Sequence, residues 1–344
     1  MNKKIIYFLT VLMILGVCSS SRAQAQTDHD SVPVAIAIHA GAGTIKRGEF
    51  PESREQEIRA KLEQAVKAGY DLLASGASSL DAVTKAITIL EDSPFFNAAR
   101  GAVFNADGQN ELDSSIMDGA NLDAGAVTGV HSVRNPILLA RKVMTDSVHV
   151  MLMGEGAEKF ARNHDIVFED DEYFYTEYRW QQLQKAREKA TVEDKTSSLS
   201  ETPDQWFSTV GAVALDVNGD LAAGTSTGGM TNKRWGRVGD SPIIGAGTYA
   251  DNHSCAVSAT GHGEYFIRAT VARDICARVQ FTGVTLQEAA DQVIMQQLVE
   301  MGGSGGIIAI DPQGNISLTY NTPGMYRASV DVNGEVTVAI FGDE

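Results

Sequence analysis

Hydrophobic residues recur along this chain with a helical spacing in some segments and in short unbroken runs in others. The helical spacing predicts α-helices over residues 58–73, 80–90, 136–143, 154–163, 175–190, 263–279 and 286–300. Ser78 or Ser79 is suited to begin the second of these helices, and Pro136 is suited to begin the third. Gly76 separates the first helix from the second.

The short apolar runs predict β-strands over residues 34–38, 121–130, 209–216, 220–226, 306–310, 315–319 and 335–340. Val217-Asn218-Gly219 is typical of a hairpin turn between two of these strands. Because strands and helices come from both halves of the chain, we expect an α+β fold. Its four layers would be two mainly antiparallel sheets stacked face to face and covered on each side by helices, an αββα sandwich.

The hydrophobic pattern lapses over residues 191–208. This segment is polar, contains Pro203 and has no apolar period, so it is expected to be an exposed and mobile linker. A regular strand pattern resumes at Thr209.

The N-terminus has the pattern of a signal peptide over residues 1–25. Two lysines precede the apolar run 5–17, and small residues at 23–25 suit a cleavage site. The apolar run is shorter than the ~20 residues that a membrane-spanning helix needs. Cys18 is an alternative site for lipidation, but the bulky residue before it favours cleavage after Ala25. We therefore expect a periplasmic or secreted protein.

Charge and cysteine content narrow the partners and the means of stabilisation. The net charge of −16 becomes −19 once Lys3, Lys4 and Arg22 are removed with the leader. Such a surface repels nucleic acid and anionic membranes, so neither is expected as a partner. Cys255 and Cys276 are too few for a disulfide framework and lack metal-ligand spacing, so the apolar core is expected to hold the fold by itself.

Most sequence motifs for nucleophilic, metal or phosphate chemistry are absent, including G-x-S-x-G, H-E-x-x-H, the P-loop and C-x-x-C. The glycine run 302–306 leads into a strand and is expected to form a tight bend. Asp107 and Asp113 miss the spacing of a calcium loop, and Asp107-Gly108 is better explained as a turn. His262 has no evident carboxylate partner nearby in sequence, so we expect it to be a spectator.

Four blocks remain, rich in threonine and glycine and holding one Arg/Asp pair: TVG at 209–211, TSTGG at 225–229, GRVGD at 236–240 and TGHGE at 260–264. A hydroxyl is a weak nucleophile unless a base adjoins it. The α-amine of a chain-terminal threonine, whose pKa is near 8 in model peptides, is such a base. That chemistry requires a chain break before Thr209. Alone, a threonine that opens a strand is better explained by β propensity, and only the four blocks together favour catalysis.

From Thr209 to Arg327 the chain closely resembles the β-chain of the plant-type asparaginases, also called isoaspartyl peptidases, which are N-terminal-nucleophile hydrolases. The segments TVGAVALD, TSTGGMTNK and GRVGDSP carry the resemblance. Residues 39–43, the region of Asn97 and residues 117–130 resemble the α-chain of that family.

The resemblance implies self-cleavage between Ser208 and Thr209. The products would be an α subunit of residues 26–208 and a β subunit of residues 209–344, which together form one domain. Two such αβ units would assemble into a dimer, a heterotetramer of chains. The implied activity is hydrolysis of β-aspartyl dipeptides and L-asparagine, with release of L-aspartate. Ser208 stands where this family usually has glycine.

The resemblance also assigns catalytic roles. Thr209 supplies the nucleophilic hydroxyl and, through its amine, the base, and Thr227 hydrogen-bonds close to that hydroxyl. Thr260 and the backbone of Gly261 form the oxyanion hole.

Substrate binding is assigned in the same way. Arg237 would clamp the α-carboxylate of the substrate, and Asp240 with the carbonyl of Gly263 would receive its α-ammonium, with Gly261 alongside. A substrate gripped by both groups presents its side-chain amide to Thr209. Trp235 borders this site and bears on which leaving group fits.

The loop from Leu90 to Arg100 resembles one that holds a structural sodium ion through backbone carbonyls, here those of Leu90, Glu91, Ser93, Phe96, Ala98 and Arg100. No other cofactor is expected. Two alternative functions remain. One is glycosylasparaginase, which shares the threonine nucleophile and GRVGDSP. The other is an uncleaved protein that binds aspartate-like amino acids without chemistry.

Overall fold

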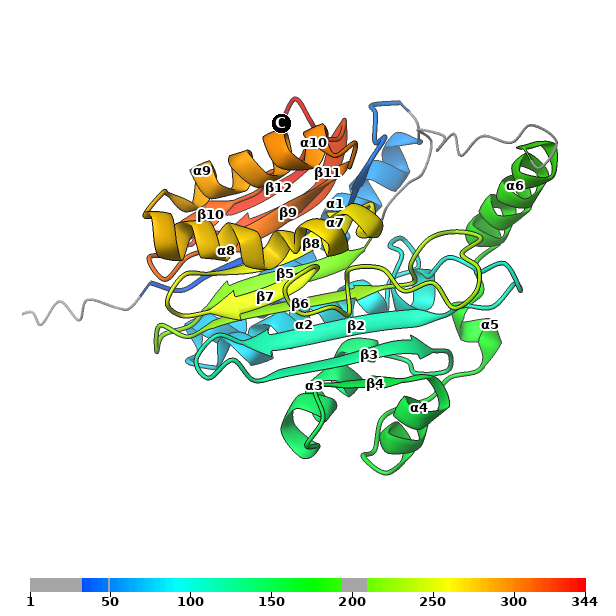
Figure 1. Cartoon of the computed structure of the whole chain (residues 1–344), viewed down its shortest axis with the longest axis horizontal. Helices are drawn as coiled ribbons and strands as arrows, with labels where there is room; N and C mark the ends of the chain where they lie inside the picture. Colours follow the sequence, from blue (N-terminus) through cyan, green and yellow to red (C-terminus); the bar gives the residue numbers. More distant parts are fainter. Residues whose placement is uncertain (1–32, 49, 194–208) are drawn as a thin grey trace, which may run out of the picture. The chain divides into compact units, whose positions relative to one another are not determined.

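Two β-sheets form the centre of the computed structural model, which describes residues 33–48, 50–193 and 209–344. The larger sheet has eight strands in the order β12-β11-β1-β5-β6-β2-β3-β4 (Figure 1). Their bounds are Ala35–Gly43 (β1), Leu112–Asp118 (β2), Ala124–Val130 (β3), Met151–Met153 (β4), Val210–Leu215 (β5), Leu221–Thr227 (β6), Gly324–Val330 (β11) and Val336–Phe341 (β12). The smaller sheet, in the order β10-β9-β8-β7, is built from Thr248–Asp251 (β7), Cys255–Gly261 (β8), Gly305–Ile310 (β9) and Ile316–Ser317 (β10).

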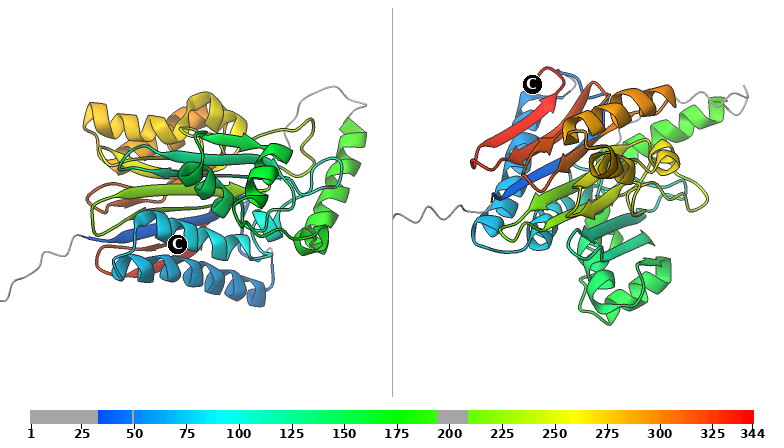
Figure 2. Two further views of the ribbon diagram at one scale, coloured as in Figure 1. Left: turned by 90° about the horizontal axis from the view of Figure 1, so that it is seen from below. Right: turned by 60° about the vertical axis from the view of Figure 1, so that its left-hand side comes forward.

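Helices cover the outer face of each sheet, which gives the four layers visible in the left view of Figure 2. Helices α1 (Glu52–Ala74) and α2 (Ser79–Glu91) pack on the larger sheet, and α8 (Val271–Thr282) and α9 (Leu286–Asp291) pack on the smaller one. The other helices are α3 (Pro136–Asp146), α4 (Gly154–Arg162), α5 (Asp171–Phe174), α6 (Glu177–Glu193), α7 (Gly263–Ala269) and α10 (Leu298–Glu300), with a 3-10 turn at Ala99–Gly101 and a π-helical turn at Gln292–Gln297. The predicted αββα sandwich is confirmed.

Three apolar cores hold these layers together. One lies between the large sheet and α1 and α2, where Leu62, Ile87 and Leu90 are fully buried. A second joins the small sheet to α8 and α9. The third, between the two sheets, is rich in small residues such as Ala37 and Ala256, which allow close approach of the sheets. Each large aliphatic side chain buried in this way stabilises the fold by about 1.5–3 kcal/mol.

Sequence patterning missed strands β2, β4, β7, β8 and β11, and for two of them a physical cause is visible. Of these, β2 and β8 carry Ser115 and Ser258 on buried faces, where the hydroxyls hydrogen-bond between the sheets. Buried hydroxyls interrupt the apolar runs by which strands are recognised. The helix expected over 263–279 is two helices, because Thr270 adopts a left-handed conformation with φ 48°.

A disulfide joins Cys255 of β8 to Cys276 of α8. The expectation that the core holds the fold without a cross-link is therefore wrong in this respect. The two cysteines are 21 residues apart in sequence, and only the packing of α8 on β8 brings them together. One such bond typically stabilises a fold by about 2–4 kcal/mol.

Some predictions fall outside the described residues. These are the signal peptide over 1–25, the cleavage position Ser208 and most of the predicted linker, although α6 continues to Glu193 and so includes its first residues. Among the described helices, none combines the length and apolarity that crossing a membrane requires.

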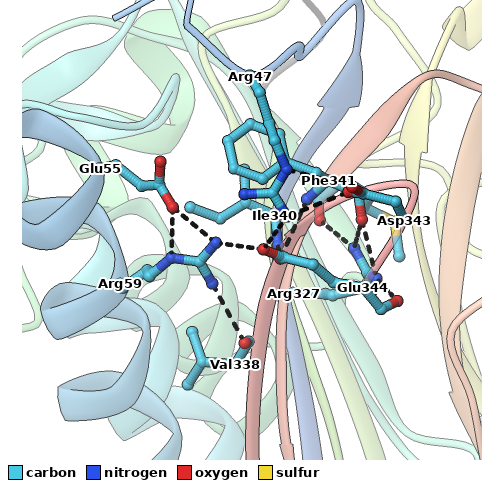
Figure 3. A network of polar contacts seen from close by, with 10 residues as sticks. Arg47, Glu55, Arg59, Arg327, Val338, Ile340, Phe341, Asp343 and Glu344 are labelled. Atoms are coloured by element: carbon cyan, nitrogen blue, oxygen red, sulfur yellow. Dashed lines mark hydrogen bonds and ion pairs between the residues drawn. The ribbon is translucent and has the colours of Figure 1, made fainter. Parts of the chain in front are cut away.

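The last strand is tied to α1 by a polar network around Glu344 (Figure 3). The Glu344 carboxylate accepts hydrogen bonds from Arg59 (2.6 Å), Arg47 (3.0 Å) and the Ile340 N–H (2.8 Å). Partial burial would raise the pKa of Glu344, but these donors outweigh it and lower the pKa to about 2. The network fixes β12, the edge strand of the large sheet, which lies beside β11 and is separated from β6 by β11, β1 and β5.

Candidate active site

Thr209 and Thr227 meet where two neighbouring strands of the large sheet lie side by side. Thr209 immediately precedes β5, and Val210 pairs with Ser226 of β6. This register brings the Thr209 hydroxyl to 3.1 Å from the Thr227 hydroxyl, to which it donates. The Thr227 hydroxyl also accepts a hydrogen bond from the Gly229 N–H at 3.0 Å. Both threonines are buried, with 7% and 3% of their surface exposed, so their hydroxyls have few competing water partners.

The loop after Thr227 is held by Asn97. Its side-chain amide donates to the Gly229 carbonyl at 2.7 Å, and its own carbonyl accepts from the Gly228 N–H at 3.1 Å. A side chain on Gly228 would lie 2.5 Å from the Asn97 side-chain oxygen, so only glycine fits there. The resemblance noted around Asn97 therefore corresponds to a residue that positions the Thr227 loop.

His39 fixes the carbonyl of Thr209 from the other side. Its Nδ1 lies 2.9 Å from the Thr209 carbonyl oxygen, and its Nε2 lies 2.9 Å from the Ser258 hydroxyl. Burial lowers the pKa of His39 to about 3, against the opposing effect of the Thr209 carbonyl, so the ring is neutral. Because a carbonyl only accepts, the proton is assigned to Nδ1, and Ser258 then donates to Nε2.

A chain of hydroxyls continues this network between the sheets. Ser115 donates to Thr248 (2.8 Å), Thr248 donates to Thr225 (2.6 Å), and Thr225 lies 2.7 Å from Ser258. If each hydroxyl donates to the next, the chain ends at the Thr209 carbonyl through His39, and the single protons of Ser115 and Thr225 are then shared with the carbonyls of Ser241 and Gly247. The Ser115 hydroxyl also lies 2.6 Å from the carbonyl of Ser241. The network thus extends from Thr209 to the residue next to Asp240.

Thr260 and Gly261 lie at the end of β8, which faces β5 and β6 across the sandwich. Side chains alternate along a strand, so Thr260 points to the same side as Ser258, toward the large sheet. Thr260 is fully buried, and within the described residues its hydroxyl has no hydrogen-bond partner. Gly261 has φ 155°, and a side chain there would lie 2.5 Å from the Ser304 carbonyl oxygen. A buried donor without an acceptor is suited to a charge that arises during a reaction.

Arg237, Asp240 and Gly263 converge on one point. A side chain on Gly263 would lie 2.8 Å from both Arg237 Nη2 and Asp240 Oδ1, so glycine is required for this approach. Asp240 is 4% exposed, and in the described part of the chain its Oδ2 has no hydrogen-bond partner. Burial raises the pKa of Asp240 to about 7, although the positive charge of Arg237 opposes this.

Glu264 is the residue of this site that sequence reasoning missed. It accepts two hydrogen bonds from Arg237, from Nε at 2.9 Å and from Nη2 at 2.8 Å. His262 Nε2 lies 3.4 Å from the same carboxylate, so the expectation that His262 lacks a nearby carboxylate partner is wrong. Glu264 closes the TGHGE block, and its position beside Gly263 was the available signal. The bidentate pair orients the guanidinium plane and leaves three of its five N–H groups for a ligand.

The chain matches the family described as asparaginase over residues 32–340. The isoaspartyl peptidase of Escherichia coli (strain K12) is 52% identical over 310 residues, covering 90% of this chain and 96% of that protein. The isoaspartyl peptidase of Salmonella typhimurium is 50% identical over 297 residues, with 85% and 94% covered. The isoaspartyl peptidase/L-asparaginase of Rattus norvegicus is 42% identical over 310 residues, with 90% and 89% covered.

Proposed function

Since the chain belongs to the asparaginase family, we propose that it is an isoaspartyl peptidase with L-asparaginase activity. It hydrolyses β-aspartyl dipeptides and L-asparagine and releases L-aspartate. The observation that carries this proposal is the Thr209 hydroxyl, which lies 3.1 Å from the Thr227 hydroxyl. The same site holds the buried Asp240 and the guanidinium of Arg237. The names of the relatives favour this activity over that of a glycosylasparaginase.

The enzyme arises by self-cleavage between Ser208 and Thr209. The Thr209 hydroxyl attacks the carbonyl of Ser208, the C–N bond breaks and an ester forms in its place. Water then hydrolyses the ester, which frees the Thr209 hydroxyl and leaves an α-amine on the same residue. The products are an α subunit of residues 26–208 and a β subunit that begins at Thr209. The fixed carbonyl of Thr209, held by His39 at 2.9 Å, supports this step because it restrains the residue that must attack.

In the mature enzyme the α-amine of Thr209 is the base for its own hydroxyl. The hydroxyl oxygen attacks the side-chain amide carbon of the substrate, and the developing oxyanion accepts hydrogen bonds from the Thr260 hydroxyl and the Gly261 N–H. The amine then passes its proton to the leaving nitrogen, and an aspartyl ester of Thr209 remains. Water activated by the same amine cleaves this ester. The Thr260 hydroxyl, buried and without a partner in the described structure, supports its assignment as an oxyanion donor.

The α-groups of the substrate are gripped at the other end of the site. The N–H groups of Arg237 that Glu264 leaves unused bind the α-carboxylate, and Asp240 with the Gly263 carbonyl binds the α-ammonium. An amino acid held by both groups presents its β-amide to Thr209. Peptides whose aspartate lies within an ordinary chain lack both free groups and are excluded.

A sodium ion bound by the 90–100 loop is a structural part of this proposal. A side chain on Gly101 would collide with the carbonyl oxygens of Phe96 and Ser93, so only glycine leaves room for both. The Phe96 and Ala98 carbonyls each accept one backbone hydrogen bond, which leaves a second lone pair for an ion. Backbone oxygens suit a hard cation. In the described residues no group of three or more His, Cys, Asp or Glu side chains gathers as a metal site.

Export and assembly complete the proposal. The leader over residues 1–25 directs the protein to the periplasm or the exterior, and the Cys255–Cys276 disulfide suits such an oxidising compartment. Two αβ units assemble into a dimer.

The decisive assay compares three substrates on the purified, cleaved protein: β-aspartyl-leucine, L-asparagine and N-acetylglucosaminyl-asparagine. We expect aspartate release from the first two, and Thr209→Ala prepared in parallel is the inactive control. A marked preference for the glycan conjugate would instead establish a glycosylasparaginase. An intact chain that binds aspartate but hydrolyses none of the three would establish a binding protein.

A further inference from the structure

A tight turn beside the proposed binding site carries a tryptophan in an unusual conformation. The Arg237 N–H donates to the Arg234 carbonyl at 3.0 Å, and the two residues between them, Trp235 and Gly236, have φ 56° and 66°. Positive φ at both central positions defines a type I′ turn, which favours Asn, Asp or Gly at the position that Trp235 occupies. A bulky aromatic residue is disfavoured there on backbone grounds.

Packing within the chain does not offset this disadvantage. Trp235 is 96% exposed. Within residues 33–48, 50–193 and 209–344, its indole makes no ring contact, hydrogen bond or cation–π contact. The Arg234 side chain likewise has no ion pair or hydrogen bond there. A strained backbone conformation at an exposed aromatic residue is typical of residues that contact a ligand, because the side chain does not contribute to the stability of the fold.

The turn is held firmly at both ends. On one side the Lys233 ammonium is buried and donates to the Glu111 carbonyl at 2.9 Å, and the Lys233 carbonyl accepts from Ala106 at 2.8 Å. On the other side Arg237 is held by Glu264. Trp235 is therefore exposed on a turn whose two ends are held in place, and its backbone position relative to Arg237 is fixed.

The proposed substrate carries a group that can contact Trp235 and Arg234. Arg237 and Asp240 take the aspartyl part of a β-aspartyl dipeptide in the proposed function, so the second residue of the dipeptide must find its contacts outside that pair. That second residue carries a free carboxylate and its own side chain. Arg234 offers a guanidinium for the carboxylate, and Trp235 offers an apolar face for the side chain.

We propose that Arg234 and Trp235 form the leaving-residue subsite, and that the preferred substrates are β-aspartyl dipeptides with an aromatic or large aliphatic second residue. The inference rests on the proposed function, and it goes further by naming the substrate class. L-Asparagine, whose leaving group is ammonia, has nothing to place in this subsite.

The test measures kcat/KM of the cleaved protein for β-aspartyl-phenylalanine, β-aspartyl-alanine and L-asparagine. In Trp235→Ala the ratio of the phenylalanine dipeptide to asparagine should fall on the order of tenfold, because one hydrophobic contact is lost. Trp235→Phe should restore most of that ratio. In Arg234→Gln, KM should rise for both dipeptides, and the rise should disappear when the carboxylate of the second residue is amidated.

Val148→Ala is the matched control, since Val148 is 95% exposed and lies outside the site. Equal effects of Trp235→Ala on all three substrates, or no effect on any, would overturn the inference while leaving the proposed function standing. Loss of the dimer in Trp235→Ala on size-exclusion chromatography, with the substrate ratio unchanged, would assign the indole to a second copy of the chain. Failure of the unaltered protein to hydrolyse any of the three substrates would instead count against the proposed function.

Discussion

The two sides of the proposed active site are built in different ways. The hydroxyl side lies on strands: Thr209 precedes β5, Thr227 ends β6 and Thr260 lies on β8, and all three are buried. On the recognition side, Arg237 and Asp240 lie on the irregular segment between β6 and β7, and Gly263 and Glu264 begin α7. Five residues of that segment have positive φ: Gly229, Asn232, Trp235, Gly236 and Gly245. Paired strands hold reacting groups at fixed positions. A turn-rich segment, by contrast, tolerates substitution of its side chains without disturbing the sheet. Under the proposed function, the strands therefore hold the reacting groups and the loop sets the choice of substrate.

This contrast predicts that substitutions on the strands abolish turnover, with the largest effect at Thr209. Thr209→Ala removes the nucleophile, so the precursor should stay whole and amide hydrolysis should fall by a factor of at least about a thousand. Electrophoresis and an aspartate-release assay report the two effects. Thr209→Ser, which keeps a hydroxyl, is the control and should retain cleavage. Normal cleavage of the Thr209→Ala precursor would show that Thr209 is not the nucleophile.

The next largest effect is expected at Thr260. Thr260→Val keeps the shape of the side chain and removes only the hydroxyl, so kcat should fall about a hundredfold to a thousandfold while KM changes little. Steady-state kinetics on L-asparagine separates the two constants. A change confined to KM would show that Thr260 contributes to substrate binding and not to stabilisation of the oxyanion.

The recognition side should show itself in pH dependence. Because burial raises the pKa of Asp240 to about 7, its carboxylate is lost as the pH falls through 7, and with it the partner for the substrate ammonium. Arg237, Glu264 and Asp113 are the charged groups that act on it. KM for L-asparagine should rise by up to about tenfold per pH unit below 7. Protonation of the Thr209 α-amine, the proposed base, should lower kcat on the acid side, so KM is the constant that reports on Asp240.

Asp240→Asn provides the control for that pH profile. It should bind L-asparagine weakly at every pH and lose the inflection near 7. If the inflection persists in Asp240→Asn, another group is responsible, and the ammonium site must be sought elsewhere.

The smallest effect is expected from the hydroxyl network between the sheets. Ser258→Ala removes the donor to His39, so the fold should lose about 1 kcal/mol of unfolding free energy and kcat should fall only several-fold. Thermal denaturation and kinetics measure the two. Thr248→Val, two links further from His39, is the matched control and should lower stability with less effect on kcat. Equal effects of both variants on kcat would make the network purely structural.

Much of the frame could be predicted from the sequence because its signals are local. The hairpin from Thr209 is marked by two apolar runs and a turn, and α2 begins where Ser78 accepts a hydrogen bond from Asp81. Strands β2 and β8 were missed because the hydroxyls that join the sheets break their apolar pattern. These strands become recognisable only when the two sheets face each other.

The candidate site divides in the same way. Each named residue could be placed by motif, and so could the pairing of the Thr209 and Thr227 hydroxyls, but other contacts could not. The pairing of Glu264 with Arg237 and the disulfide between Cys255 and Cys276 depend on how α7 and α8 meet the rest of the molecule. Contacts of this kind are set by tertiary packing, which sequence spacing does not encode.

In the proposed mechanism the catalytic base is the α-amine of Thr209, which exists only after the chain is cut before this residue. N-terminal sequencing of the smaller fragment of the active protein tests it most directly. We expect this fragment to begin Thr-Val-Gly-Ala-Val, with Thr209 as its first residue. A fragment that begins elsewhere, or an uncut chain that hydrolyses β-aspartyl amides at full rate, would contradict it.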